Sequence, residues 1–305
     1  MPRPVKDGKI VRYECAPEQT TGLAGMRLRK IWEDFMKNDL FTIGGVTIHG
    51  YGLMIGLGII AAYTMSEYRA KKKGLDSDPI ISIALWGVAA GLICAKLLYY
   101  ITIFDEILAD PSLLVNFSDG FVVYGGIVGG IFGGWLYCKV KKLPFFKYFD
   151  LVMPAVALAQ GLGRIGCFLA GCCYGLQMES PISIVFTQSD FAPNNVPLLP
   201  TQLISSGLDF LHCLVLLYAA KRCKHDGQVS ALYLIFYSIG RFGLEYLRGD
   251  LVRGSVGTFS TSQFISLFIL AAGVILYVMC PKLQGKEEIR DTEKLEDADN
   301  LHRMD

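Results

Sequence analysis

Seven apolar stretches run along this chain, and no other feature of its sequence constrains the fold as strongly. A helix needs about 20 mostly apolar residues to cross the hydrocarbon core of a bilayer. Of the 305 residues, 52% are hydrophobic and only 19% are charged, which is too apolar for an ordinary soluble domain. We therefore predict an all-α integral membrane protein with seven transmembrane helices. They are expected near Ile43–Met65, Ile80–Ile103, Phe121–Tyr137, Leu151–Leu169, Leu203–Ala220, Val229–Leu247 and Phe264–Met279.

The charges of the connecting loops predict the orientation, because lysine and arginine in short loops stay on the cytoplasmic side of a membrane. Three basic connections, after the first, third and fifth spans, alternate with acidic or neutral ones. We therefore expect the N-terminus outside and the C-terminus in the cytoplasm. The basic residues among the first forty favour the opposite orientation if they count at full weight. The residues next to the first span, "NDLFTIGGVTIHG", include no lysine or arginine.

The predicted organisation has three parts. Residues 1–42 form an extracytoplasmic N-terminal segment, residues 43–280 form the transmembrane domain, and residues 281–305 form a charged cytoplasmic tail that is disordered or a frayed helix. A net charge of +1 does not suggest a nucleic-acid partner, and the four histidines lack the HxxxH or HExxH spacing of zinc enzymes. We expect a multi-pass protein of the plasma membrane.

Ionisable side chains within the spans are the candidates for function, because each costs at least about 2.5 kcal/mol at the centre of a bilayer. Arg164 lies near the outer end of the fourth span, and Arg241, Glu245 and Arg248 lie at positions i, i+4 and i+7 of the sixth. This spacing puts the last three on one helix face, where Glu245 can pair with both guanidinium groups. Two interpretations remain open, a structural ion pair and an anion-binding site.

Five sequence blocks occur in a fixed order along the spans. They are "TIHGYGLMIGLGI", "DGFVVYGGIVGG", "GRIGCFLAGCCYG", "LPTQL" and "GRFGLEYLRGD". In these blocks the chain resembles the prolipoprotein diacylglyceryl transferases, bacterial membrane enzymes that move diacylglycerol from phosphatidylglycerol to a lipoprotein cysteine. The resemblance covers Leu40 to Tyr277 and implies the same seven spans and orientation.

The resemblance also implies roles for individual residues. Arg164 matches the essential arginine of the family signature, and Gly175 matches the glycine that closes it. The implied catalytic residues are Arg164, Arg241, Tyr124 and Glu245. The implied substrate-binding residues are Arg164, Arg241, Arg248, Tyr51, Gly125, Gly126, Gln202 and Gly175.

Three positions depart from the family pattern. Tyr124 stands where the family has a histidine proposed as a base, Cys167 where it has asparagine, and Cys172 where it has glutamate. A tyrosine with an ordinary pKa of about 10 is a weak base at neutral pH unless cations lower that pKa. Asp119, in the preceding loop, is an alternative base, and Tyr124 is then an interfacial aromatic residue.

Three of the nine cysteines, Cys167, Cys172 and Cys173, cluster in the sequence beside Arg164. A cationic neighbour lowers the pKa of a thiol and favours its chemistry, or disulfide formation on the oxidising side of a membrane. The sequence has no CxxC motif and no histidine near these cysteines, so the pattern gives little support to a metal or redox centre.

These observations lead to one main interpretation and two alternatives. In the main one, Arg164 and Arg241 hold the phosphate of phosphatidylglycerol, because the planar guanidinium donates bidentately to phosphate oxygens. The expected partners are phosphatidylglycerol, prolipoprotein signal peptides and membrane lipid, with no cofactor, no metal and no nucleic acid. The alternatives are a divergent member that uses another phospholipid or acceptor, and a non-catalytic lipid-binding or transport protein.

Overall fold

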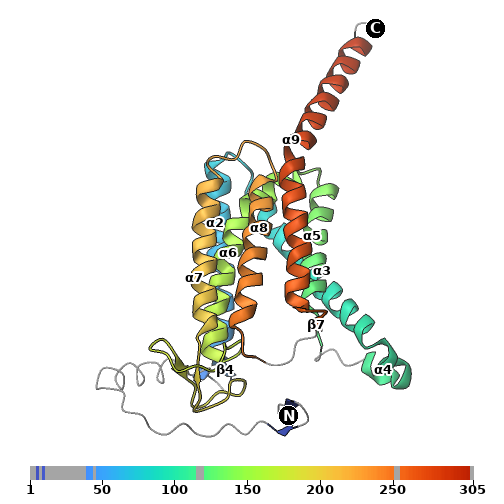
Figure 1. The fold of residues 1–305 in the computed structure, drawn as a ribbon. Helices are drawn as coiled ribbons and strands as arrows, with labels where there is room; N and C mark the ends of the chain where they lie inside the picture. Colours follow the sequence, from blue (N-terminus) through green and yellow to red (C-terminus); the bar gives the residue numbers. More distant parts are fainter. Residues whose placement is uncertain are drawn as a thin grey trace. The chain divides into compact units, whose positions relative to one another are not determined.

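The computed structural model of the chain describes residues 5–6, 9–10, 39–43, 46–114, 120–250 and 255–302. Within these residues the fold is mostly helical (Figure 1), and a long helix lies at each of the seven apolar stretches. Four of these helices, α3, α6, α7 and the first part of α9, are long and apolar enough to cross a membrane. The long helices are α2 (Gly50–Lys72), α3 (Asp78–Thr102), α5 (Val123–Val140), α6 (Phe145–Ala170), α7 (Thr201–Ala219), α8 (Gln228–Leu244) and α9 (Thr261–His302).

Short elements complete the described fold. The short helices are α4 (Phe104–Ala109), η1 (Pro111–Leu114) and η2 (Glu245–Leu247). Four two-stranded antiparallel hairpins are formed by β1 (Val5–Lys6) with β2 (Lys9–Ile10), β3 (Asp39–Ile43) with β4 (Val46–His49), β5 (Ile184–Val185) with β6 (Pro197–Leu198), and β7 (Ser255–Val256) with β8 (Phe259–Ser260).

The start of the first long helix was predicted wrongly. The chain from Asp39 to His49 forms the β3–β4 hairpin, and α2 begins at Gly50 rather than at Ile43. The segment is rich in the β-branched residues that favour strands, and Thr42 pairs with Thr47 across the hairpin. Hydropathy placed these residues in a span, because a short apolar segment can belong to a strand or to the end of a helix and hydropathy does not distinguish the two.

The chain divides into two compact units, which are described separately. Unit 2 consists of residues Tyr63–Val152. In it α5 packs closely along α3, because a glycine lies every four residues at the contact. A Cβ atom added at Gly125 would lie 2.5 Å from the Cys94 carbonyl oxygen, and one at Gly129 would lie 2.5 Å from that of Ala90. These glycines therefore set the spacing of the two helices.

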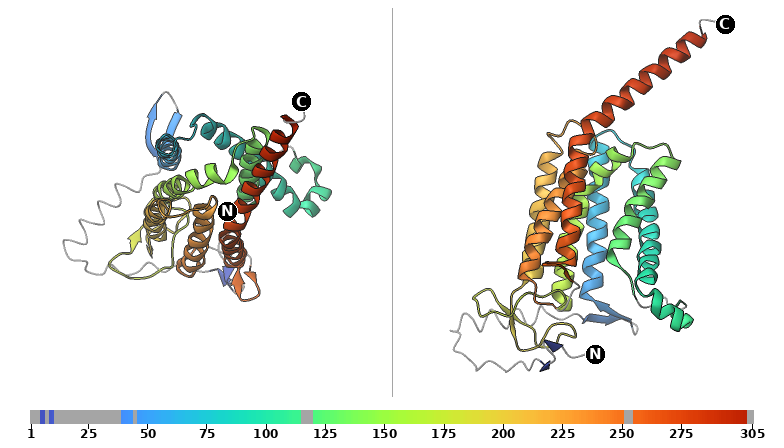
Figure 2. Two further views of the ribbon diagram at one scale, coloured as in Figure 1. Left: turned by 90° about the horizontal axis from the view of Figure 1, so that it is seen from above. Right: turned by 45° about the vertical axis from the view of Figure 1, so that its right-hand side comes forward.

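Unit 1 consists of residues Met1–Ala62 and Met153–Asp305. Figure 2 shows α7, α8 and α9 side by side, and α8 packs against both of the others. A Cβ atom added at Gly166 of α6 would lie 3.2 Å from the Tyr51 carbonyl oxygen, so α2 and α6 also approach closely. The backbone of residues 281–302, the predicted tail, continues α9.

The loop between α6 and α7 has a small core of its own. The core is made of Phe168, Ile184, Phe186, Ala192, Val196 and Leu198. It fixes the loop against the end of α6, which positions the residues of the functional site described next. Most of residues 1–42, and Asp119, lie outside the described residues.

Candidate functional site

A cavity of about 360 Å³ lies among α6, α7 and α8 in unit 1. Arg164 and Arg241 both line it, from α6 and α8 respectively. Most of its other lining residues are apolar, and the polar ones are Gln160, Ser205, Asp209, His212 and Tyr237. The cavity therefore combines apolar walls with a few charged groups, as ligand sites commonly do.

A narrow crevice of about 10 Å³ shares Arg164, Arg241 and two other residues with this cavity. Its wall includes Arg248, Cys173 and Gln202. The three arginines that the sequence selected are thus brought to one place, although they come from different parts of the chain. Three arginine residues that line one crevice favour an anionic ligand.

The carboxylates near these arginines are paired differently from the sequence-based expectation. The Arg241 guanidinium lies 3.1 Å from the Glu245 carboxylate and donates a 2.9 Å hydrogen bond to the Ser262 hydroxyl. Arg248 instead donates from Nε to Asp250 Oδ1 at 2.7 Å. The prediction of one continuous helix face was therefore wrong, because α8 ends at Leu244 and Arg248 has an extended conformation.

Backbone hydrogen bonds to a distant segment explain why the helix ends there. The Leu176 N–H donates to the Leu247 carbonyl at 3.0 Å, and the Gly249 N–H donates to the Tyr174 carbonyl at 3.2 Å. Gly175 and Arg248 form an isolated antiparallel β-bridge within this pairing. A Cβ atom at Gly175 would lie 2.6 Å from the Leu199 carbonyl oxygen and 2.8 Å from that of Leu247, so no larger residue fits.

The end of α6 folds back on itself through a glycine. Gly171 has a φ of +75°, its N–H donates to the Phe168 carbonyl, and the Cys172 N–H donates to the Cys167 carbonyl. This is the hydrogen-bond pattern of a Schellman C-cap, for which glycine is favoured because it adopts positive φ without strain. The turn brings Cys172 and Cys173 back beside Cys167.

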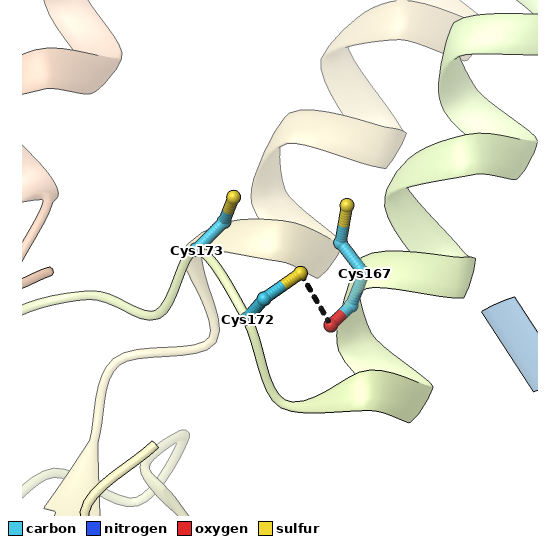
Figure 3. A group of neighbouring side chains, drawn as sticks. All are labelled: Cys167, Cys172 and Cys173. Carbon is cyan, nitrogen blue, oxygen red and sulfur yellow. Dashed lines mark hydrogen bonds between the residues drawn. The ribbon is translucent and has the colours of Figure 1, made fainter. Parts of the chain in front are cut away.

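The three thiols form a cluster (Figure 3). Their sulfur atoms all lie within 4.8 Å of one another, and each residue is partly buried. The Cys172 thiol donates to the Cys167 carbonyl at 3.7 Å. Hydrogen bonds with Cys167 and Cys172, helped by the nearby Arg248 guanidinium, lower the pKa of the Cys173 thiol. Among the described residues, these three cysteines form the one group of at least three His, Cys, Asp or Glu side chains close enough together to bind a metal ion.

Comparison with known proteins identifies the family. The sequence model of the prolipoprotein diacylglyceryl transferases matches residues 38–279. The chain belongs to this family. It is 48% identical to the phosphatidylglycerol–prolipoprotein diacylglyceryl transferase of Clostridium tetani over 79% of this chain and 97% of the relative. Identity is 46% to a second such transferase, from Clostridium perfringens, over 83% and 98%, and 34% to that of Clostridioides difficile over 81% and 96%.

Two residues of the cavity were missed by the sequence analysis. Asp209 and His212 lie one turn apart on α7, and Asp209 is close enough to Arg164 for electrostatic attraction. His212 is 8% exposed and stacks on Tyr233, and its Nε2 has no hydrogen-bond partner among the described residues. Both lie within a predicted span, so the rule that intramembrane ionisable groups face polar cavities could have found them.

The remaining family positions are divided between the two units. Tyr51, in unit 1, contacts α6 at Gly166. Tyr124, Gly125 and Gly126 belong to unit 2, where Gly125 packs against α3. The residues that line the cavity and the crevice all belong to unit 1.

Proposed function

We propose that this chain transfers the diacylglyceryl group of phosphatidylglycerol to the lipobox cysteine thiol of prolipoproteins and releases glycerol phosphate. The observation that carries the proposal is the group of three arginines, Arg164, Arg241 and Arg248, at one crevice beside a largely apolar cavity. The names of the relatives, which are phosphatidylglycerol–prolipoprotein diacylglyceryl transferases, support the same activity.

The arginines suit the leaving group of this reaction. The acceptor thiolate attacks the C3 carbon of the lipid glycerol, a C–S bond forms, and the C–O bond to the phosphate breaks with its electron pair on oxygen. The departing phosphate gains charge, which Arg164 and Arg241 stabilise from both sides. Glu245 orients Arg241 through their ion pair, and Tyr124 stays the predicted proton acceptor.

The remaining predictions about the substrates and the membrane belong to the same proposal. Four further residues are proposed to belong to the substrate-binding set, namely Gln202, Tyr51, Gly125 and Gly126. The protein is proposed to cross the plasma membrane seven times, with the N-terminus outside. The four helices that are long and apolar enough to span support a membrane location.

The decisive test is lipoprotein maturation in bacterial cells depleted of their own transferase. Expression of this chain should restore maturation, and the purified full-length protein should transfer diacylglycerol from phosphatidylglycerol vesicles to a lipobox peptide. Turnover only with another lipid or acceptor would overturn the stated substrates. Lipid binding without any turnover would overturn catalysis altogether.

A further inference from the structure

We propose that Cys167, Cys172 and Cys173 form a three-thiolate site for a thiophilic divalent metal ion such as zinc, and that the open fourth position binds the acceptor thiol. The identity of the acceptor rests on the proposed function. Spacing along the sequence gives little support to such a site, because it is the turn after α6 that brings the three thiols together.

The spacing of the sulfur atoms fits a tetrahedral ion. With metal–sulfur bonds of about 2.3 Å, two sulfur ligands of a tetrahedral zinc ion lie about 3.8 Å apart. The three sulfur atoms already lie within 4.8 Å of one another (Figure 3), so small rotations of the side chains complete the geometry. Three protein ligands and one open position are the pattern of catalytic zinc sites, whereas structural sites have four protein ligands.

The backbone that carries the thiols is held in place. The Schellman turn at Gly171 fixes Cys172 against Cys167. The Gln202 amide donates to the Cys172 carbonyl at 2.8 Å, and the Thr201 hydroxyl donates to the Cys173 carbonyl at 3.0 Å. Such tethering reduces the conformational entropy that the chain loses on binding an ion.

Two further observations indicate that a ligand approaches here. Gln202 is 1% exposed and lines the crevice beside Cys173, yet its Oε1 has no hydrogen-bond partner among the described residues. Arg248 interacts with the Cys173 sulfur and lines the same crevice. A divalent ion with three thiolates carries a charge of −1, which the Arg248 guanidinium stabilises.

The metal site would hold and activate the acceptor thiol close to the arginines that bind the lipid phosphate. Coordination to the metal lowers the pKa of the acceptor thiol, so that its proton passes readily to the proton acceptor of the reaction. The bound sulfur then attacks the lipid C3 carbon, and glycerol phosphate leaves toward Arg164 and Arg241. The thioether product is neutral and is a weaker ligand than a thiolate, so it dissociates. The metal is neither oxidised nor reduced.

The first experiment measures metal binding without reference to activity. Full-length protein is purified in detergent, loaded with Zn²⁺ or Co²⁺, and assayed by elemental analysis and by the sulfur-to-cobalt charge-transfer absorption. We expect about one ion per chain and a tetrahedral cobalt spectrum. Cys167→Ser, Cys172→Ser and Cys173→Ser should each lower metal affinity by at least about tenfold. Cys223→Ser, which changes a cysteine in the loop after α7, is the matched control and should bind normally.

The second experiment tests whether the acceptor thiol is the fourth ligand. A lipobox peptide added to the cobalt protein should raise the charge-transfer intensity by about one third, from three sulfur ligands to four, and the same peptide with serine in place of cysteine should not. Chelation should abolish diacylglyceryl transfer, and Zn²⁺ should restore it.

The two proposals fail in different ways. Full transfer by metal-free protein, or a disulfide among the three cysteines in the active enzyme, would overturn the metal site and leave the proposed function intact. Stoichiometric metal binding with no transfer to any lipobox peptide would overturn the proposed function. A cobalt spectrum that does not change when the cysteine peptide is added would show that the acceptor thiol does not bind at the fourth position. Variants are compared only if their thermal unfolding in detergent matches that of Cys223→Ser.

Discussion

Arg164 of α6 and Arg241 of α8 line both the cavity and the crevice beside it. Each already has an acidic neighbour in unit 1, Asp209 for Arg164 and Glu245 for Arg241. A third guanidinium, that of Arg248, lines the crevice and pairs with Asp250. The two cavity arginines face one space from two helices, which is the arrangement expected of a clamp for a single phosphate.

The clamp predicts that the two arginines act together. Arg164→Ala and Arg241→Ala should each weaken phospholipid turnover by about 1.5–3 kcal/mol in transition-state stabilisation, as for other hydrogen bonds to charged groups. The double variant should cost clearly less than the sum, because both groups bind one phosphate. Turnover and lipid binding are measured for all four proteins. Strict additivity would mean that the arginines act on different groups.

Replacing Arg164 by lysine separates charge from geometry. Lysine keeps the positive charge but cannot donate two parallel hydrogen bonds to phosphate. Arg164→Lys should therefore retain most lipid binding and lose most turnover. Wild-type turnover in this variant would exclude a bidentate contact.

Asp209 should oppose anion binding, because its carboxylate lies near Arg164. Asp209→Asn removes a negative charge from the cavity wall, so phosphatidylglycerol should bind more tightly by on the order of 1 kcal/mol, about fivefold in Kd. Vesicle binding by the purified protein measures this change. The same substitution in the Arg164→Ala background is the control and should have a smaller effect. Weaker binding in Asp209→Asn would assign the carboxylate to the lipid instead.

Gly175 and Gly207 offer a matched pair of glycine substitutions. Gly175→Ala should destabilise the protein by about 1–3 kcal/mol, because its Cβ would collide with two carbonyl oxygens. It should also impair turnover by displacing the segment that carries Arg248. Gly207 is helical and has open space around it, so Gly207→Ala should be neutral or stabilise by up to about 1 kcal/mol. Thermal unfolding in detergent distinguishes the two, and equal stability would contradict the close packing at Gly175.

The cysteines of unit 1 test the orientation. Thr201, at the start of α7, contacts the Cys173 carbonyl, and the Cys223 N–H donates to the Ala219 carbonyl at the end of the same helix. The two cysteines are therefore separated by the length of α7, about 28 Å for 19 residues, close to the thickness of the hydrocarbon core. An impermeant thiol reagent applied to intact cells after chelation should modify Cys173, whose lowered pKa favours reaction, and should spare Cys223. Labelling of Cys223 from outside would reverse the predicted orientation.

Local sequence was sufficient to predict the helices and several members of the site. The lengths of the apolar stretches predicted the positions of all seven long helices among the described residues, because burial of a segment in lipid depends on its composition over about 20 residues. The sequence also identified Arg164, Arg241 and Arg248 as candidates, because a charged side chain within an apolar membrane segment is costly and usually has a function. The resemblance to the family, carried by five short blocks, was confirmed by the match over residues 38–279.

Only the tertiary structure decided where those helices end and which side chains meet. The start of α2 depends on strand pairing between residues 39–43 and 46–49, and the end of α8 depends on backbone hydrogen bonds to the segment after α6. The cavity position of Asp209 depends on how α7 packs against α6 and α8. The meeting of three thiols at one point depends on a turn through Gly171 and on its tethers to Gln202 and Thr201. Composition and spacing describe neighbours along the chain, whereas these contacts join segments that only folding brings together.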